Sequence, residues 1–135
     1  NTQKVKQVIN LEMLGRARGR RSDQQLPFVT FDQHDDWVID SLNKHYSLLS
    51  GTESRTDFFL FDDFKNQQLY SRSDNYSFSK LKIPANTIML SNGKDKYYHH
   101  PDDEWDTIDY PLMEKIVRAI ALAVTPFLYS PGPRP

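Results

Sequence analysis

The 135-residue sequence contains no cysteine, no long apolar run and almost no net charge. Without cysteine, the chain has no disulfides, no thiolate metal sites and no cysteine nucleophile. No apolar stretch approaches the roughly 20 residues of a membrane-spanning helix, so we expect no membrane span. The 17 basic and 18 acidic side chains give a net charge of −1, which argues against a nucleic-acid partner bound mainly through overall charge.

What the chain does contain is enough apolar and aromatic surface for one core. Apolar residues make up 38% and aromatic residues 13% of a chain with the length of a single domain, which is unlike a disordered protein. Basic groups are concentrated in residues 1–21, and residues 101–109 hold five acidic groups and no basic one. The four arginines of segment 16–21 could hold a phosphate or a carboxylate. Because no aromatic residue interleaves with them, we expect an exposed loop and no nucleic-acid site.

Short apolar runs alternate with amphipathic stretches along the sequence. The patterns predict strands near residues 8–13, 28–31, 57–61 and 84–90, and helices near residues 35–49, 73–81 and 111–128. This alternation predicts a three-layer α/β domain. Functional residues in such folds gather where strands end, which directs attention to Glu12 and to the loop after residue 90.

These two places carry residues suited to metal chemistry. Glu12 is the only acid in its predicted apolar strand, and residues 97–103 combine two tyrosines, two histidines and two aspartates. Neutral imidazole and carboxylate are zinc ligands, and a carboxylate often orients a ligating histidine. The residue types alone leave other interpretations open, because adjacent histidines in a polar loop are often only solvated. Glu12 could equally pair with a nearby arginine.

Three motifs, in this order, resemble those of the M28 family of zinc aminopeptidases. Asn10–Arg16 (NLEMLGR) resembles the strand-end motif Asn-x-Asp-Met-x-Gly-Arg. Ser73–Phe78 (SDNYSF) resembles Ser-Asp-His-x-x-Phe, and Ile83–Ala85 after it resembles part of Gly-Ile-Pro-Ala. Tyr98–Asp103 (YHHPDD) resembles Tyr-His-x-Pro-x-Asp. The resemblance implies a three-layer α/β/α fold with a mixed sheet, as in zinc exopeptidases.

The resemblance also implies roles for individual residues. It implies that Glu12 binds one of two zinc ions and that His99 binds the other. Tyr98 matches a position that in some members offers its phenol to the developing oxyanion, a charge that such a donor stabilises. Asp103 and Asp74 would steady the ligands without binding metal themselves. The motifs imply no residues for binding the substrate.

The sequence departs from the family pattern at two positions and lacks part of the family's site. Glu12 stands where aspartate is usual and reaches one methylene further, and Asn75 stands where histidine is common. The family's His-x-Asp motif, bridging aspartate and Glu-Glu pair lie upstream, whereas the nine residues before Asn10 include no His, Asp or Glu. We therefore expect residues 5–128 to be the C-terminal portion of an M28-like domain and residues 129–135 to be a disordered tail.

The function that the resemblance implies is that of a zinc aminopeptidase, which hydrolyses N-terminal residues from peptides and of which this chain is the C-terminal part. Two alternatives fit the same motifs. One is a glutaminyl-cyclase-like zinc acyltransferase, and the other is a non-catalytic binding module on a degenerate peptidase scaffold. The expected partners are a peptide substrate and the missing N-terminal half of the domain. Exposed surface on a half domain also favours homo-oligomers, and family members with this role are often secreted or periplasmic.

We predict that the isolated chain does not hydrolyse peptides. Two zinc ligands without a general base cannot assemble a two-metal hydrolytic site. The test incubates the purified 135-residue chain with zinc and an aminoacyl-anilide and follows release of the aniline. Metal-dependent release would contradict the prediction.

Overall fold

The structure is a computed structural model that describes residues 5–31, 37–51, 57–64 and 66–129. Its main elements are, in chain order, β1 (Val8–Glu12), β2 (Phe28–Thr30), α1 (Trp37–Ser50), β3 (Leu60–Phe61), α2 (Leu69–Arg72), α3 (Asn75–Ser79), β4 (Ala85–Met89) and α4 (Tyr110–Tyr129). Two 3₁₀ turns, at Ser22–Gln25 and Trp105–Thr107, lie in the loops.

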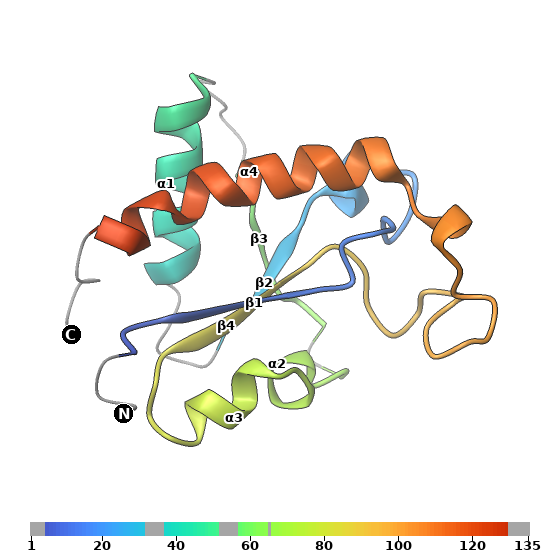
Figure 1. Cartoon of the computed structure of the whole chain (residues 1–135), viewed down its shortest axis with the longest axis horizontal. Helices are drawn as coiled ribbons and strands as arrows, with labels where there is room; N and C mark the ends of the chain where they lie inside the picture. The colour runs from blue at the N-terminus through green and yellow to red at the C-terminus, as the bar shows by residue number, and fades with distance from the viewer. Residues whose placement is uncertain (1–4, 32–36, 52–56, 65, 130–135) are drawn as a thin grey trace.

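The four strands form a mixed sheet between two layers of helices. The strand order is β1-β4-β2-β3, with β4 parallel to β1 and antiparallel to β2, and with β2 parallel to β3. Figure 1 shows α1 and α4 over one face of this sheet and α2 and α3 over the other. The three-layer α/β/α fold with a mixed sheet is therefore confirmed.

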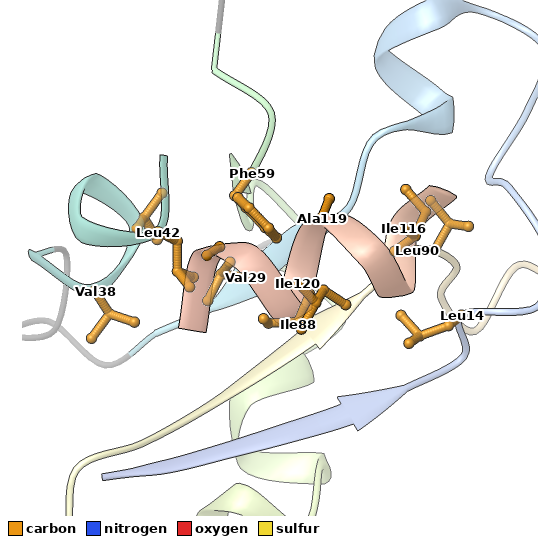
Figure 2. Packing of buried hydrophobic residues seen from close by; sticks show 12 residues of the cluster. Leu14, Val29, Val38, Leu42, Phe59, Ile88, Leu90, Ile116, Ala119 and Ile120 are labelled. Atoms are coloured by element: carbon orange, nitrogen blue, oxygen red, sulfur yellow. The ribbon is translucent and has the colours of Figure 1, made fainter. Parts of the chain in front are cut away.

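The main core lies between the sheet and the pair α1 and α4 (Figure 2). Helical spacing places Ile116, Ile120 and Ala123 on one face of α4, and all three are buried. Val38 and Leu42 of α1 pack into the same cluster. Fully burying an aliphatic side chain of this size stabilises the fold by about 1.5–3 kcal/mol. The long apolar face predicted for residues 111–128 is thus the face that attaches α4 to the sheet.

A buried polar network crosses the sheet and attaches α3 to it. The amide of Asn86 donates to the carbonyl of Thr30 at 3.1 Å and accepts a bond from the Gln7 amide at 2.8 Å. On the opposite face of β4, the hydroxyl of Thr87 donates to Oδ1 of Asn75 at 2.8 Å. Buried polar groups are costly unless they are paired, so these bonds favour one register and one position of α3.

Strand β1 and the segment after β3 differ from the prediction. The sequence predicts a buried strand at residues 8–13, but among the described strands β1 pairs only with β4 and lies at the edge of the sheet. Leu11, on this strand, is half exposed. The predicted helix 73–81 is present as the shorter helix α3, which spans Asn75–Ser79. The short helix α2 before it was not predicted, and Ser73, which separates the two helices, is extended with φ −93° and ψ 161°.

The predicted strand 57–61 is reduced to the two residues of β3, and the reason is one side chain of α1. Oδ1 of Asn43 accepts the backbone N–H groups of Phe58 and Phe59 at 2.9 and 2.8 Å, and Nδ2 donates to the carbonyl of Phe59 at 2.9 Å. These backbone groups are therefore taken by a side chain and are not available to β2.

Several other expectations concern the ends of elements. The predicted helix start at residues 35–36 lies outside the described residues, and α1 is described from Trp37. Helix α4 is described through Tyr129, and the remaining residues of the predicted tail, 130–135, lie outside the described residues. Among the described helices, none is both long enough and apolar enough to cross a membrane.

We predict that Asn43→Ala destabilises the domain by about 2–3 kcal/mol, because it leaves backbone groups beside the buried Phe59 without partners. Urea unfolding followed by circular dichroism measures the loss. Asn66→Ala is the matched control, because Asn66 is exposed, and it should change the free energy of unfolding by less than about 0.5 kcal/mol. Equal effects of the two substitutions would show that the contacts of Asn43 contribute nothing.

Candidate functional site

An open cleft of about 540 Å³ lies where β1 and β4 end. The two strands are parallel, so their carboxyl ends meet at the same edge of the sheet (Figure 1). Glu12 and Met89, the last residues of the two strands, line the cleft. The rest of its wall comes from the loop after β1, from α2 and from the loop between β4 and α4.

Glu12 enters the cleft from the end of β1 and is held by a serine. The hydroxyl of Ser73 donates to Oε2 of Glu12 at 2.9 Å. Ser73 is buried between α2 and α3, so its position is fixed by the fold. Directly after Glu12, Met13 adopts a left-handed backbone conformation with φ 53°, which turns the chain away from the sheet. The carboxylate is thus oriented at a sharp strand end.

Tyr98 and His99 reach the same cleft from the loop after β4. Their rings are stacked, with centroids 4.0 Å apart and an interplanar angle of 18°. His99 has a left-handed backbone with φ 55°, a strained conformation for a residue with a side chain. Such strain persists only where the surrounding structure holds it, and it concentrates at functional sites. Both side chains line the cleft with Glu12, although they lie in a distant part of the sequence.

Arg16 joins the two sides of the cleft. Its guanidinium lies 2.9 Å from Oδ2 of Asp95 and 2.9 Å from Oδ1 of Asp103, and it donates to the hydroxyl of Thr107 at 2.8 Å. It also lies over the ring of Tyr97, 5.0 Å from the centroid. One side chain from the loop after β1 therefore fixes the loop that carries His99.

The Asp95 carboxylate stays ionised although it is almost buried. Burial alone would raise the pKa of Asp95, but hydrogen bonds from the Tyr97 amide, from Arg16 and from Ser91 outweigh it and lower the pKa below its ordinary value. Burial disfavours the charge of Arg16, but its bonds to Asp95 and Asp103 outweigh that effect and raise its pKa. Each charge thus stabilises the other in a partly buried place.

The remaining predicted site residues fall in different places. Asp103 lines the cleft and pairs with Arg16. Asp74 is exposed at the start of α3 and does not line the cleft. Asn75 is buried in the network on β4. His100 points to Asp102, at 3.4 Å, and is exposed. Sequence reasoning missed the contact of Ser73, and the signal that could have found it is its place beside Asp74 in the second motif.

The arginines of segment 16–21 divide into two groups. Arg18 donates to the carbonyls of Leu26, Leu90 and Asp23 and lies over the ring of Phe28, 4.7 Å from the centroid. Burial lowers the pKa of Arg18, although nearby aspartates partly compensate. Arg16 and Arg18 therefore hold the protein's own groups. Arg20 and Arg21 are exposed, as the sequence predicts for this loop.

The donor set is incomplete for a zinc ion. Within residues 5–31, 37–51, 57–64 and 66–129, no three or more His, Asp or Glu side chains are grouped so that they could hold a metal ion. Glu12 and His99 offer one carboxylate and one imidazole, both of which are zinc ligands. A structural zinc site uses four protein ligands and a catalytic one three. The residues present therefore fit part of a zinc site and not a whole one.

Comparisons with known proteins agree with the fold and the motifs. A sequence model of peptidase family M28 matches residues 1–124. The structure of an aminopeptidase from Aneurinibacillus sp. strain AM-1 is similar, with a TM-score of 0.58 and 21% sequence identity over 91% of this chain. The match covers 26% of that aminopeptidase, so the chain spans about a quarter of its length. No curated protein sequence matches the chain at a significant level.

We predict that Asp95→Asn lowers the free energy of unfolding by about 2 kcal/mol at pH 7, because Arg16 loses a nearly buried partner and keeps only Asp103 and Thr107. The pKa of Asp95 is lower in the folded chain than in the unfolded chain. Its contribution to the free energy of unfolding is therefore complete at pH values above the ordinary pKa of an aspartate, and it is lost as the pH falls through the lower pKa of the folded chain. The deficit of the variant should therefore shrink as the pH falls below the ordinary pKa of an aspartate, about 4, toward the lower pKa of the folded chain.

Urea unfolding at several pH values measures this deficit. Asp106→Asn is the control, because Asp106 is exposed and forms no ion pair with the described residues. A deficit for Asp95→Asn that stays constant from pH 7 to low pH would contradict the assignment of an ionised Asp95.

Proposed function

The chain belongs to peptidase family M28, and from this we propose that it is the C-terminal part of a zinc-dependent aminopeptidase, which removes N-terminal residues from peptides. The observation that carries the proposal is that two motifs far apart in the sequence contribute residues to the same cleft. Glu12, Tyr98 and His99 come from the first and third motifs, and all three line one cleft. Peptidases are hydrolases, and a cleft of about 540 Å³ has the size of an ordinary ligand-binding pocket.

We propose Glu12 and His99 as zinc ligands. Zinc bound in a hydrolytic site polarises a carbonyl group and lowers the pKa of a bound water. The chain's own contribution is to hold the two donors: Ser73 orients the Glu12 carboxylate, and Arg16 fixes the loop of His99 through Asp103. The other donors and the general base would come from the missing N-terminal half of the domain, which is the partner that this proposal requires.

The cleft also offers groups for the peptide itself. The phenol of Tyr98 can donate a hydrogen bond to the carbonyl oxygen that gains negative charge during hydrolysis. Leu69, Met89 and Ile108 give the cleft an apolar wall, which suits an apolar side chain on the residue to be removed. By family resemblance, we further propose that the whole protein is secreted or periplasmic.

We predict that the full-length polypeptide containing this chain hydrolyses an aminoacyl-anilide in a zinc-dependent reaction, and that Glu12→Ala and His99→Ala each lower kcat/KM by about a hundredfold or more. Loss of a ligand should also lower the zinc content, which elemental analysis of the purified protein measures. The matched controls are Glu114→Ala on α4 and His100→Ala beside His99, whose side chains are exposed and do not line the cleft.

Three other results would contradict the proposal in different ways. Loss of ammonia from an N-terminal glutamine, without release of a residue, would identify a cyclase. Zinc binding without any turnover of peptides would favour a non-catalytic module. Full activity in both ligand variants would show that Glu12 and His99 do not hold the metal.

A further inference from the structure

Arg72 is a cation on the wall of the cleft that none of the family motifs accounts for. It is the last residue of α2, it is exposed, and it lines the cleft with Glu12 and His99. Among the described residues, no carboxylate forms an ion pair with it. Its Nη1 donates to the carbonyl of Gln67 at 3.2 Å, and its Nη2 donates to the phenol oxygen of Tyr98 at 3.3 Å.

The second bond determines where the proton of Tyr98 can point. A guanidinium has N–H donors and no acceptor, so the phenol oxygen must be the acceptor in this contact. The hydroxyl proton of Tyr98 is therefore not used by Arg72. None of the described residues accepts it, since the bond from Arg72 is the one hydrogen bond of this phenol within the described part of the chain. The proton remains available to a group in the cleft.

The ring of Tyr98 is also held from a second side. The imidazole of His99 stacks on its face at 4.0 Å, while Arg72 contacts its oxygen. These contacts restrain both the plane of the ring and the position of its hydroxyl. The positive charge of Arg72 at the phenol oxygen also polarises the hydroxyl, which makes its proton a stronger hydrogen-bond donor.

We propose that Arg72 is a positioning residue, which holds the phenol of Tyr98 so that its proton is donated to the substrate oxygen. The inference rests on the proposed function and deepens it, because it explains how a phenol on the wall of an open cleft can be held in place as a hydrogen-bond donor. A hydrogen-bond donor that is already in position stabilises the transition state more, because it need not be reoriented during the reaction. Arg72 acts through Tyr98 and does not itself touch the reacting atoms.

The test measures kcat and KM of the full-length polypeptide with zinc and an aminoacyl-anilide. Arg72→Ala should lower kcat about fivefold, the effect of one ordinary hydrogen bond, and leave KM within about twofold. Arg72→Lys should recover part of the loss, because an ammonium also donates. Arg118→Ala is the matched control, since Arg118 is exposed on α4, pairs with Glu114 and does not line the cleft.

The decisive comparison is a double-mutant cycle with Tyr98→Phe. If Arg72 acts through the phenol, Arg72→Ala should lower kcat no further in a protein that already carries Tyr98→Phe. The same loss in both backgrounds would mean that Arg72 contacts the substrate directly, and it would overturn the proposal. A rise in KM with unchanged kcat, or kinetics equal to those of the control, would also overturn it.

A second measurement does not depend on peptidase activity. In the 135-residue chain, isotope-labelled tyrosine reports the ζ-carbon of Tyr98 by nuclear magnetic resonance. Arg72→Ala should shift this signal and Arg118→Ala should not, because only Arg72 touches the phenol oxygen. An unchanged signal would overturn the inference. If the full-length protein hydrolyses nothing while the signal shifts, the proposed function fails and the contact between Arg72 and Tyr98 stands.

Discussion

Strand β4 is enclosed on both edges and both faces, and the rest of the structure is arranged around this constraint. It pairs with β1 on one edge and with β2 on the other, and all five of its residues are buried. Ile88 faces the core under α1 and α4, while Thr87 faces α3 through the bond to Asn75. A strand in this position leaves its neighbours little freedom in register. The parallel pairing with β1 then sets the end of β1 beside the start of the loop that carries His99.

Ion pairs of Arg16 restrain the two loops that the sheet brings together. The fold brings two loops to the same edge, but within the described part of the chain only two backbone bonds join them, from Ser91 to Met13 and from Asp109 to Gly15, so much of their mutual restraint depends on side chains. The bonds of Arg16 to Asp95 and Asp103 supply that restraint, because a partly buried guanidinium with two carboxylate partners has few other arrangements of similar energy. The ion pairs of Arg16 thus hold the loops around the cleft, whereas Leu69 and Met89, which also line it, are held by apolar packing.

The sequence predicted the parts of the fold and site that depend on local patterns. The period of Ile116 and Ile120 identified α4, and the motif around Glu12 and the one around His99 located the two loops. What the sequence could not predict depends on contacts between distant residues. The capture of the Phe58 and Phe59 amides by Asn43, which shortens β3, has no signature in the local pattern. The bond from Ser73 to Glu12 joins residues 61 positions apart, and it is visible only once the sheet is formed.

The bonds of Arg16 also have a consequence for how the molecule folds. Arg16 and Asp95 are 79 positions apart, and the same loop is joined to the start of α4 by the bond from the Asp109 amide to the carbonyl of Gly15 at 2.8 Å. Closing loops of this length costs chain entropy, and this cost comes before the contacts between the joined residues can stabilise the fold. The cleft therefore cannot be complete until the ribosome has synthesised the loop after β4, because the residues that line it extend from Glu12 to Ile108.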